Sequence, residues 1–265
     1  MAASDAPISI GCVSLVVNNL TMTAEFYERI IGLSLLHRDG EAAMLGAGSA
    51  PLIELRQDKA AKRFPDEAGL FHTAFLIPSR GDLGAWLRYA SDLGVHLEGA
   101  SDHLVSEALY LADPEGNGIE VYWDRPKEEW QRDGDLIKMD TRSLDMDALA
   151  NATHQPWKGI PDSAVIGHVH LQVGDVANAD AFMTRTLGLT RTFHLPSASW
   201  YGAGGYHHHL AGNIWNSKGA GQRSKNSTGL AEIELLASSK TMSSGNLVDP
   251  WGNHFTISKA RSRTA

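Results

Sequence analysis

The chain has 265 residues, a net charge of −8 and a sequence pI near 5.8, a length that allows one large domain or two of ordinary size. The acidic balance and the absence of any Lys/Arg block argue against nucleic acid or an acidic membrane as the main partner. A single cysteine, Cys12, excludes an internal disulfide and fits the reducing cytoplasm, and we expect neither an export signal nor a membrane span, because no apolar run approaches the ~20 residues that a span requires.

The first predicted elements recur later in the chain. The segment IGCVSLVVNNLTMTAEFYERIIGLSL from Ile10 aligns without a gap with IGHVHLQVGDVANADAFMTRTLGLTR from Ile166. Each copy predicts a strand of alternating apolar residues, a loop, an amphipathic helix that ends at a Gly, and then short strands. We expect these short strands near 34–38, 42–45 and 52–56 in the first copy, and near 190–194, 199–202 and 206–210 in the other.

A weaker repeat follows each of these segments. GLFHTAFL from Gly69 resembles GLAEIELL from Gly229, and LADPEGNGIEVY resembles LVDPWGNHFTIS further along. Both DPxGN sequences predict turns, because Pro fixes φ while Gly and Asn tolerate positive φ. The repeats together predict an α+β protein of four βαβββ modules, over 8–57, 69–125, 164–217 and 228–259.

The spacing of the modules predicts the domain organisation. We expect an N-terminal pair of modules at 8–125, a polar connector at 126–163 with a short helix near 143–152, and a C-terminal pair at 164–259. The fourth module is truncated, because SSKTMSSGN takes the place of a helix and a strand. The segment GAGQRSKNSTG at 219–229 has the composition of a flexible loop.

One predicted hairpin gathers reactive side chains. The stretch HLVSEALYLADPEGNGIE places His103, Tyr110 and Glu120 on neighbouring strands around the first DPxGN turn. An imidazole, a phenol and a carboxylate on one hairpin indicate a site.

The four modules, the GHVHL strand start and the DPxGN hairpin resemble the vicinal oxygen chelate superfamily over nearly the whole chain. The hairpin resembles the signature of extradiol ring-cleavage dioxygenases, which is carried here by His103, Leu109-Tyr110, Asp113-Pro114, Gly116 and Glu120. Ser101 departs from that signature at a peripheral position. With GGYHHHLAGNIWN, the chain looks most like the two-domain catechol 2,3-dioxygenases.

The resemblance implies metal ligands on the first strand of two paired modules and on the last strand of one of them. The first strands hold Cys12, His72, His168 and Glu232, and the last strands of modules two and four hold Glu120 and Thr256. Modules two and three together supply two His and one carboxylate, His72, His168 and Glu120, the set that holds Fe(II) in many oxygenases. Mn(II) is an alternative metal, and His170 is the alternative ligand, because it shares a strand face with His168. A lone strand His is more often structural, and Cys12 is expected to be a small buried hydrophobe.

The resemblance also implies the catalytic residues. His208 corresponds to the acid–base histidine, with His209 as the alternate within the His207–His209 run, and His103 and Tyr110 correspond to the partners of a substrate oxygen. The simpler interpretations are a strand edge for the His run and a core aromatic for Tyr110. Tryptophans at 123, 200, 215 and 251 are candidates for a pocket wall, although strand aromatics are usually core.

The expected function is extradiol cleavage of catechol or a substituted catechol in aromatic hydrocarbon catabolism, with a small aromatic diol and O2 as substrates. The alternatives are a metal-dependent lyase or isomerase of glyoxalase type, and a non-catalytic drug-binding module of the bleomycin-resistance type. The resemblance suggests a homo-oligomer.

Overall fold

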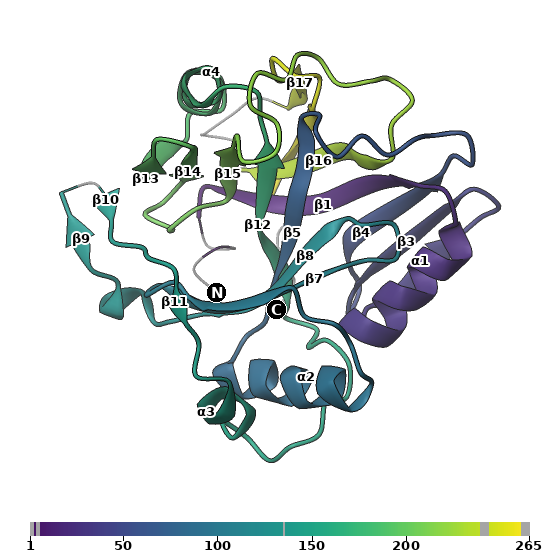
Figure 1. The fold of residues 1–265 in the computed structure, drawn as a ribbon, viewed down its shortest axis with the longest axis vertical. Helices are drawn as coiled ribbons and strands as arrows, with labels where there is room; N and C mark the ends of the chain where they lie inside the picture. The colour runs from purple at the N-terminus through teal and green to yellow at the C-terminus, as the bar shows by residue number, and fades with distance from the viewer. Residues whose placement is uncertain (1–2, 4–5, 135, 239–243, 261–265) are drawn as a thin grey trace.

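The computed structural model describes residues 3, 6–134, 136–238 and 244–260, and most of its strands lie in two sheets (Figure 1). The seven-stranded sheet has the order β17 (Gly245–Val248), β18 (His254–Lys259), β16 (Gly229–Ala237), β1 (Ile8–Val17), β4 (Ala50–Gln57), β3 (Ala42–Ala47) and β2 (Ser34–Arg38). The nine-stranded sheet has the order β11 (Arg142–Ser143), β6 (Gly99–Asp102), β7 (Ser106–Ala112), β8 (Gly118–Asp124), β5 (Gly69–Leu76), β12 (Val165–Gln172), β15 (Leu210–Asn213), β14 (Ala198–Gly202) and β13 (Thr190–Leu195). A separate two-stranded ribbon pairs β9 (Arg132–Asp133) with β10 (Leu136–Ile137).

Short helices connect the strands. They are α1 (Leu20–Phe26), α2 (Arg80–Asp92), α3 (Met146–Ala150) and α4 (Val176–Ala181), with a 3₁₀ turn at Lys127–Glu129 and π-helical turns at Tyr27–Ile31 and Phe182–Thr186. Each α-helix begins at an Asn, Ser or Asp whose side chain accepts a hydrogen bond from a backbone N–H in the first turn: Asn19, Ser79, Asp145 and Asp175. No helix within the described ranges is long and apolar enough to cross a membrane.

The predicted module architecture is confirmed. Modules one to three each contain a strand, a helix and three further strands. In the fourth module, the described residues contain β16, β17 and β18 and no helix between β16 and β17, while residues 239–243 of the SSKTMSSGN segment lie outside the described part. In every module the last strand runs parallel to the first and hydrogen-bonds with it.

The modules combine across the chain rather than in sequence order. β1 pairs with β16, so module one shares a sheet with module four, and β5 pairs with β12, so module two shares a sheet with module three. The two pairs expected at 8–125 and 164–259 therefore do not each form a sheet of their own. The first strand of each module has one edge that is not hydrogen-bonded within the module. The order of the modules along the chain does not determine which other first strand pairs with this edge.

The two DPxGN turns are built by the same hydrogen bonds. Asp113 accepts the backbone N–H groups of Glu115 and Asn117 and the side-chain amide of Asn117, and Asp249 accepts the equivalent groups of Trp251 and Asn253. Gly116 and Gly252 follow with φ of +81° and +87°, a backbone region that favours glycine. The first of these turns sets the register of β7 against β8.

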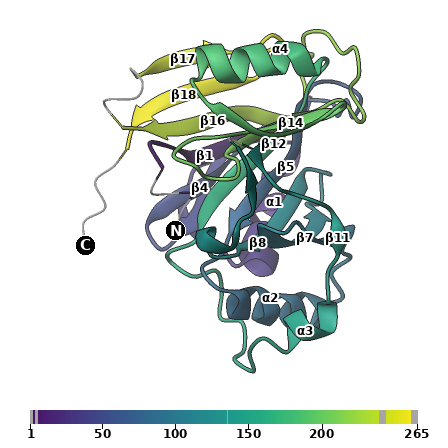
Figure 2. The same ribbon diagram turned by 90° about the vertical axis from the view of Figure 1, so that its left-hand side faces the viewer.

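The sheets share one large hydrophobic core. Aromatic contacts cross it close to the module helices: Tyr27 faces Phe75 of β5 with ring centroids 6.3 Å apart, and Phe182 faces Phe255 of β18 at 5.5 Å. Figure 2 shows α4 above β14 and above the end strands of the seven-stranded sheet. The α2 and α3 helices pack together at the opposite end of the molecule (Figure 1). The helix expected near 143–152 is present as α3, which is shorter than expected.

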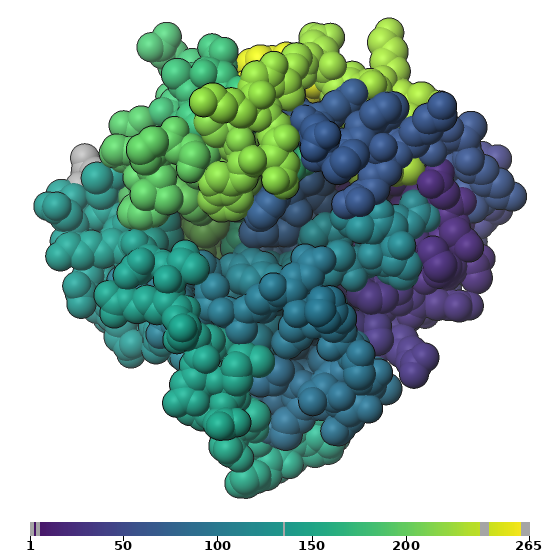
Figure 3. All heavy atoms as spheres, in the orientation of Figure 1, coloured from purple at the N-terminus to yellow at the C-terminus, as the bar shows by residue number. Residues whose placement is uncertain are grey.

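Two local predictions differ from the structure. The segment 206–210 is not a strand, because Gly204 and Gly205 with φ of +60° and +73° turn the chain and β15 begins only at Leu210. The segment 219–229 is held by tertiary hydrogen bonds. Ser224 donates from its backbone N–H and from its hydroxyl to the carboxylate of Glu67, both at 2.7 Å. Figure 3 shows the segment 219–229, in yellow-green, beside the segment that precedes β5, in blue.

Candidate metal centre

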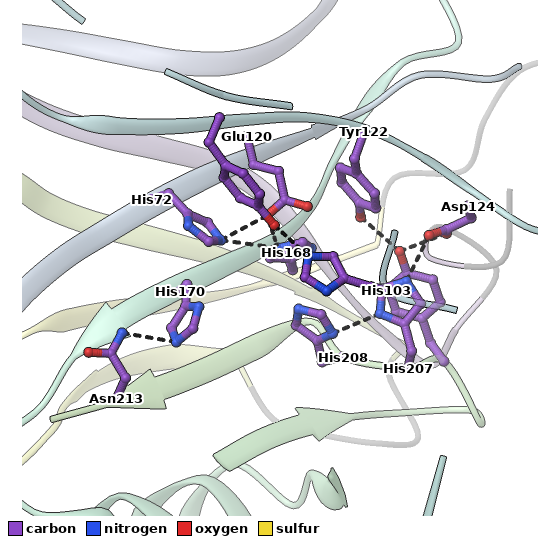
Figure 4. Close-up of polar contacts among 12 residues, drawn as sticks. His72, His103, Glu120, Tyr122, Asp124, His168, His170, His207, His208 and Asn213 are labelled. Carbon is purple, nitrogen blue, oxygen red and sulfur yellow. Dashed lines mark hydrogen bonds and ion pairs between the residues drawn. The ribbon is translucent and has the colours of Figure 1, made fainter. Parts of the chain in front are cut away.

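Three side chains converge where β5, β8 and β12 lie side by side (Figure 4). His72 comes from β5, Glu120 from β8 and His168 from β12. The Oε2 atom of Glu120 lies 3.0 Å from Nε2 of His72 and 3.1 Å from Nε2 of His168, and the two nitrogens lie 3.3 Å apart. Each residue is at least 94% buried, with exposures of 6%, 2% and 3% for His72, Glu120 and His168.

This triangle has the dimensions of a metal-binding face. Two ligands that bind one ion at a right angle from about 2.1 Å lie about 3.0 Å apart, and the three measured separations run from 3.0 to 3.3 Å. Nδ1 of His168 is buried and has no hydrogen-bond partner among the described residues, so its ring is held through Nε2. Two imidazoles and one carboxylate suit Fe(II), Mn(II) or Zn(II) by donor type.

Electrostatics keep the carboxylate ionised. Burial alone would raise the pKa of Glu120, but the imidazoles of His168 and His72 outweigh burial and hold this pKa well below its usual range. Burial lowers the pKa of His168 despite the opposing effect of Glu120. The group therefore presents a carboxylate beside a neutral His168 imidazole, which is the protonation state that a metal requires.

A cavity of about 820 Å³ opens above the three residues. All three line it, and so do Phe71, Trp200, Trp215 and Phe193, which form an aromatic wall with ring centroids 5.1–5.2 Å apart for the Phe71–Trp215 and Phe193–Trp200 pairs. Trp200 and Trp215 thus face the cavity as the sequence suggested, whereas Trp251 lies in the hydrophobic core and Trp123 packs against that core.

His103 and Tyr110 lie on the cavity wall as a hydrogen-bonded pair. Nε2 of His103 lies 2.7 Å from the Tyr110 hydroxyl, and Nδ1 lies 2.8 Å from the carbonyl oxygen of Asp140. Because a carbonyl oxygen can only accept, Nδ1 carries a proton, and an Nε2 without a proton accepts the Tyr110 hydroxyl. Burial, followed by the charge of Glu120, raises the pKa of Tyr110 well above its usual value.

The three consecutive histidines have different surroundings. His208 lines the cavity, with its ring centroid 4.1 Å from that of His168. His207 contacts Asp124 through Nε2 at 2.7 Å, and His209 contacts the carbonyl oxygen of Ala3 at 3.1 Å. His208 is therefore the member of the run that reaches the cavity, although the segment is not a strand.

His170 lies beside the three residues rather than within their group. Its Nε2 accepts the side-chain amide of Asn213 at 3.0 Å, and its ring centroid lies 5.0 Å from that of His72. Burial lowers the pKa of His170 well below its usual value, so this imidazole is neutral.

The equivalent position of the other sheet holds Cys12. This residue is half-buried rather than buried, with Sγ 3.9 Å from Sδ of Met44. Burial, followed by the charge of Glu54, raises the pKa of Cys12 to about 12, so the thiol is a weak ligand at neutral pH.

Sequence reasoning missed Asp124 and Asn213. Asp124 lies on β8 at even spacing from Glu120 through Tyr122, so the alternation of a strand already predicts all three on one face. Asn213 gives no comparable signal, because its contact with His170 depends on how β12 and β15 pair.

Comparisons with known proteins point to one superfamily. The family model of the Glyoxalase/Bleomycin resistance protein/Dioxygenase superfamily matches residues 9–121. A catechol-2,3-dioxygenase of Bacillus subtilis (strain 168) is 35% identical over 266 residues, covering 94% of this chain and 92% of that protein.

Solved structures share the fold. A putative dioxygenase from Bacillus subtilis has a TM-score of 0.64 at 14% identity and covers 94% of this chain and 84% of its own. Glyoxalase I from Zea mays has a TM-score of 0.56 at 17% identity and covers 95% and 92%.

Proposed function

The chain belongs to the Glyoxalase/Bleomycin resistance protein/Dioxygenase superfamily, and from that premise we propose that it is an extradiol dioxygenase that cleaves catechol or a substituted catechol. The observation that carries the proposal is the convergence of His72, Glu120 and His168 to within 3.3 Å at the cavity. The similarity to a catechol-2,3-dioxygenase over 94% of the chain supports it.

In this proposal His72, His168 and Glu120 hold Fe(II), or Mn(II) in its place. The bound metal would supply a common binding point for the two vicinal diol oxygens and O2, and electron transfer between them. The three residues that would hold the metal all line the cavity, from which a diol and O2 would approach it. Both atoms of O2 enter the ring-opened product.

His208 is the proposed base for a catechol hydroxyl. Burial, followed by the proximity of His168 and His207, lowers the pKa of His208 well below its usual value, so the ring is neutral and has a lone pair for a proton. Its place on the cavity wall, next to His168, puts it beside a diol held by the metal.

Tyr110 and His103 are proposed to bind a substrate oxygen. The raised pKa of Tyr110 keeps its hydroxyl protonated, so on substrate binding its one proton can turn from Nε2 of His103 to an oxygen that gains negative charge. His103 orients that hydroxyl through Nε2 and is itself held by the Asp140 carbonyl oxygen.

The size and lining of the cavity support a substituted diol. A volume of about 820 Å³ exceeds the need of a single six-membered ring, and the aromatic wall favours an apolar substituent. A cytoplasmic role in aromatic catabolism agrees with this chemistry and with the single cysteine.

The alternatives predict different ligands. A glyoxalase-type lyase or isomerase usually has more carboxylates around its metal, and the present group has one, Glu120. A drug-binding module of the bleomycin-resistance type needs no buried group of two His and one carboxylate.

Anaerobic reconstitution with Fe(II), followed by catechol and air, tests the proposal. We expect one iron per chain, a yellow ring-fission product and uptake of one O2 per catechol. The matched control is Glu120→Ala, treated in the same way, which should take up no O2. Bound iron without O2 uptake across catechol, alkylcatechols and chlorocatechols would contradict the proposal and favour the lyase, and failure to bind any metal would favour the binding module.

A further inference from the structure

His208 lies at the cavity end of a buried chain of hydrogen bonds. Nδ1 of His208 lies 2.7 Å from Nδ1 of His207, and Nε2 of His207 lies 2.7 Å from Oδ1 of Asp124 (Figure 4). The side chain of His207 is fully buried, and that of Asp124 is 12% exposed. Water therefore cannot easily take the place of either partner.

The hydrogen-bond chemistry fixes each proton. A carboxylate can only accept, so Nε2 of His207 carries a proton and donates it to Asp124. When this is the one proton on His207, its Nδ1 is an acceptor, and Nδ1 of His208 donates to it. Nε2 of the neutral His208 is left without a proton, and its lone pair is available on the cavity side.

A further hydrogen bond holds Asp124 in place. The Tyr206 hydroxyl donates to Oδ2 of Asp124 at 2.8 Å and also lies 2.8 Å from the Tyr122 hydroxyl. The ring of Trp130 lies beside both Tyr206 and His207, with centroids 5.8 and 5.1 Å away. Asp124 is thus a fixed acceptor on the strand that also carries Glu120.

We propose that Asp124 and His207 are positioning residues that hold His208 in the tautomer with its proton on Nδ1, so that Nε2 faces the diol as a base. The proposal rests on the function proposed above for its catalytic consequence, but the tautomer itself can be measured without any turnover. It extends the active site to two residues that touch neither substrate nor metal.

Asp124→Asn should invert the tautomer. The Asn oxygen would accept the Tyr206 hydroxyl, and its NH2 group would face Nε2 of His207 as a donor. His207 would then carry its proton on Nδ1 and donate to His208, whose own proton would move to Nε2. A histidine with its proton on Nε2 cannot accept one there.

Long-range ¹H–¹⁵N NMR spectra of the full-length, zinc-loaded protein report which ring nitrogen carries the proton. We expect His208 in the Nδ1–H form in the wild type and in the Nε2–H form in Asp124→Asn. Retention of the Nδ1–H form in the variant would overturn the proposal. If the wild type cleaves no catechol, the proposed function fails, and these spectra still decide the tautomer relay.

Kinetics of the iron-loaded protein provide the second measurement. In Asp124→Asn we expect kcat to fall by about 10²- to 10⁴-fold, the range of general acid–base catalysis, with KM and iron content close to wild type. His207→Asn keeps an oxygen acceptor near the position of Nδ1 and should retain kcat within about tenfold, whereas His207→Leu should lose it by 10²-fold or more. Equal kcat values in these two His207 variants would overturn the proposal even if Asp124→Asn fails to fold.

Tyr122→Phe is the matched control. It removes a buried hydroxyl from the same cluster, at the end away from His207. We expect some loss of thermal stability but an unchanged His208 tautomer and kcat. A fall in kcat equal to that of Asp124→Asn would show that any disturbance of the cluster suffices and would contradict a specific relay.

Discussion

One carboxylate oxygen of Glu120 contacts the side chains of two histidines. Oε2 lies within 3.1 Å of both His72 and His168, so removal of the carboxylate leaves two buried imidazoles without their partner. A bound metal would replace these hydrogen bonds with three ligand bonds. On the proposed function, the same three atoms hydrogen-bond with one another in the metal-free protein and bind the ion in the metal-loaded protein.

Replacement of any of the three residues with Ala should abolish metal retention. His72→Ala, Glu120→Ala and His168→Ala each remove one of three ligand atoms that lie within 4.8 Å of one another. His170→Ala is the matched control, because His170 lies in the same cavity but binds Asn213. Metal per chain after gel filtration should be near zero in the three variants and unchanged in the control, and full metal content in any of the three would remove that residue from the site.

His209 should make the fold sensitive to mild acid. Burial lowers its pKa from 6.5 to about 3. Below pH 6.5 the unfolded chain then binds more protons than the folded chain, so stability is present above pH 6.5 and is lost as pH falls toward 3. From pH 7 to pH 5 this residue alone should cost about 2 kcal/mol.

Urea unfolding of the metal-free protein at both pH values measures this loss. His209→Gln keeps an amide that can donate to the Ala3 carbonyl oxygen but does not titrate. The wild type should lose about 2 kcal/mol more than this variant between pH 7 and pH 5. Parallel losses in the two proteins would show that His209 does not contribute.

At the residue scale, the family resemblance and the repeat alignment together selected His72, His168 and Glu120. The structure brings these three side chains together, and their role as metal ligands stays a prediction. His208 was chosen over its neighbours by resemblance alone, since strand alternation does not apply to an irregular segment. The bond from His207 to Asp124 joins residues 83 positions apart, and no local pattern reports such a contact.

Among the elements, β8 depends on a glycine for its position. Gly118 pairs with His72 of β5, and a Cβ at Gly118 would lie 2.0 Å from the backbone oxygen of Phe71. The close approach of these parallel strands brings Glu120, two residues further on, to His72.

Gly118→Ala should move β8 away from β5. We expect a loss of at least 1–3 kcal/mol of stability from overpacking, together with weaker metal binding because Glu120 moves with its strand. Gly40→Ala is the control, since a Cβ at Gly40 would meet no atom within 4 Å. Thermal unfolding and metal titration should separate the two variants, and equal behaviour would contradict the role of Gly118.

Helices, strands and turns could be predicted where the signal lies in neighbouring residues of the sequence. Alternation and end signals predicted β1, β5 and β12, and the Asp and Asn bonds of the DPxGN turns explain why that motif recurs. The strand expected at 206–210 failed because the preceding glycines adopt positive φ, which glycine permits but does not require. The contact of Ser224 with Glu67 is tertiary, so composition alone described its segment as a free loop.

In the whole molecule, the cavity forms where modules two and three meet, and its outer wall includes Trp215 and Leu195. These side chains are 48% and 43% exposed. On the proposed function, they offer an apolar surface to the part of a substituted diol that extends away from its two hydroxyls.

On the proposed function, catechols with an alkyl or phenyl substituent should have a higher kcat/KM than catechol itself. Trp215→Ala should reduce that preference roughly 3- to 10-fold, since aromatic contacts contribute about 0.5–1.5 kcal/mol, while kcat/KM for unsubstituted catechol should change little. Steady-state kinetics with both substrates test this, and an equal loss for the two would show that Trp215 does not select the substituent.

At this scale the sequence predicted four modules but not their partners. The repeats identify each module, and the ligand positions indicated that modules two and three share the site. The sheet topology shows, in addition, that modules one and four share the other sheet. Which strand edges meet depends on complementary surfaces that form only after each module has folded, and these leave no periodic signal in the chain.

The pairing of β1 with β16 has a consequence for synthesis of the protein. More than 200 residues separate these strands along the chain, as the pairing of Ile8 with Ala237 shows. At about 5–20 residues per second, a ribosome needs roughly 10–45 s to make the second strand after the first. During that interval the edge of the first module has emerged without its partner, and modules two and three are complete before it is covered. A nascent chain of this protein therefore carries an unpaired edge at β1 while modules two and three are being made, and protection of β1 by a chaperone during translation would favour its yield.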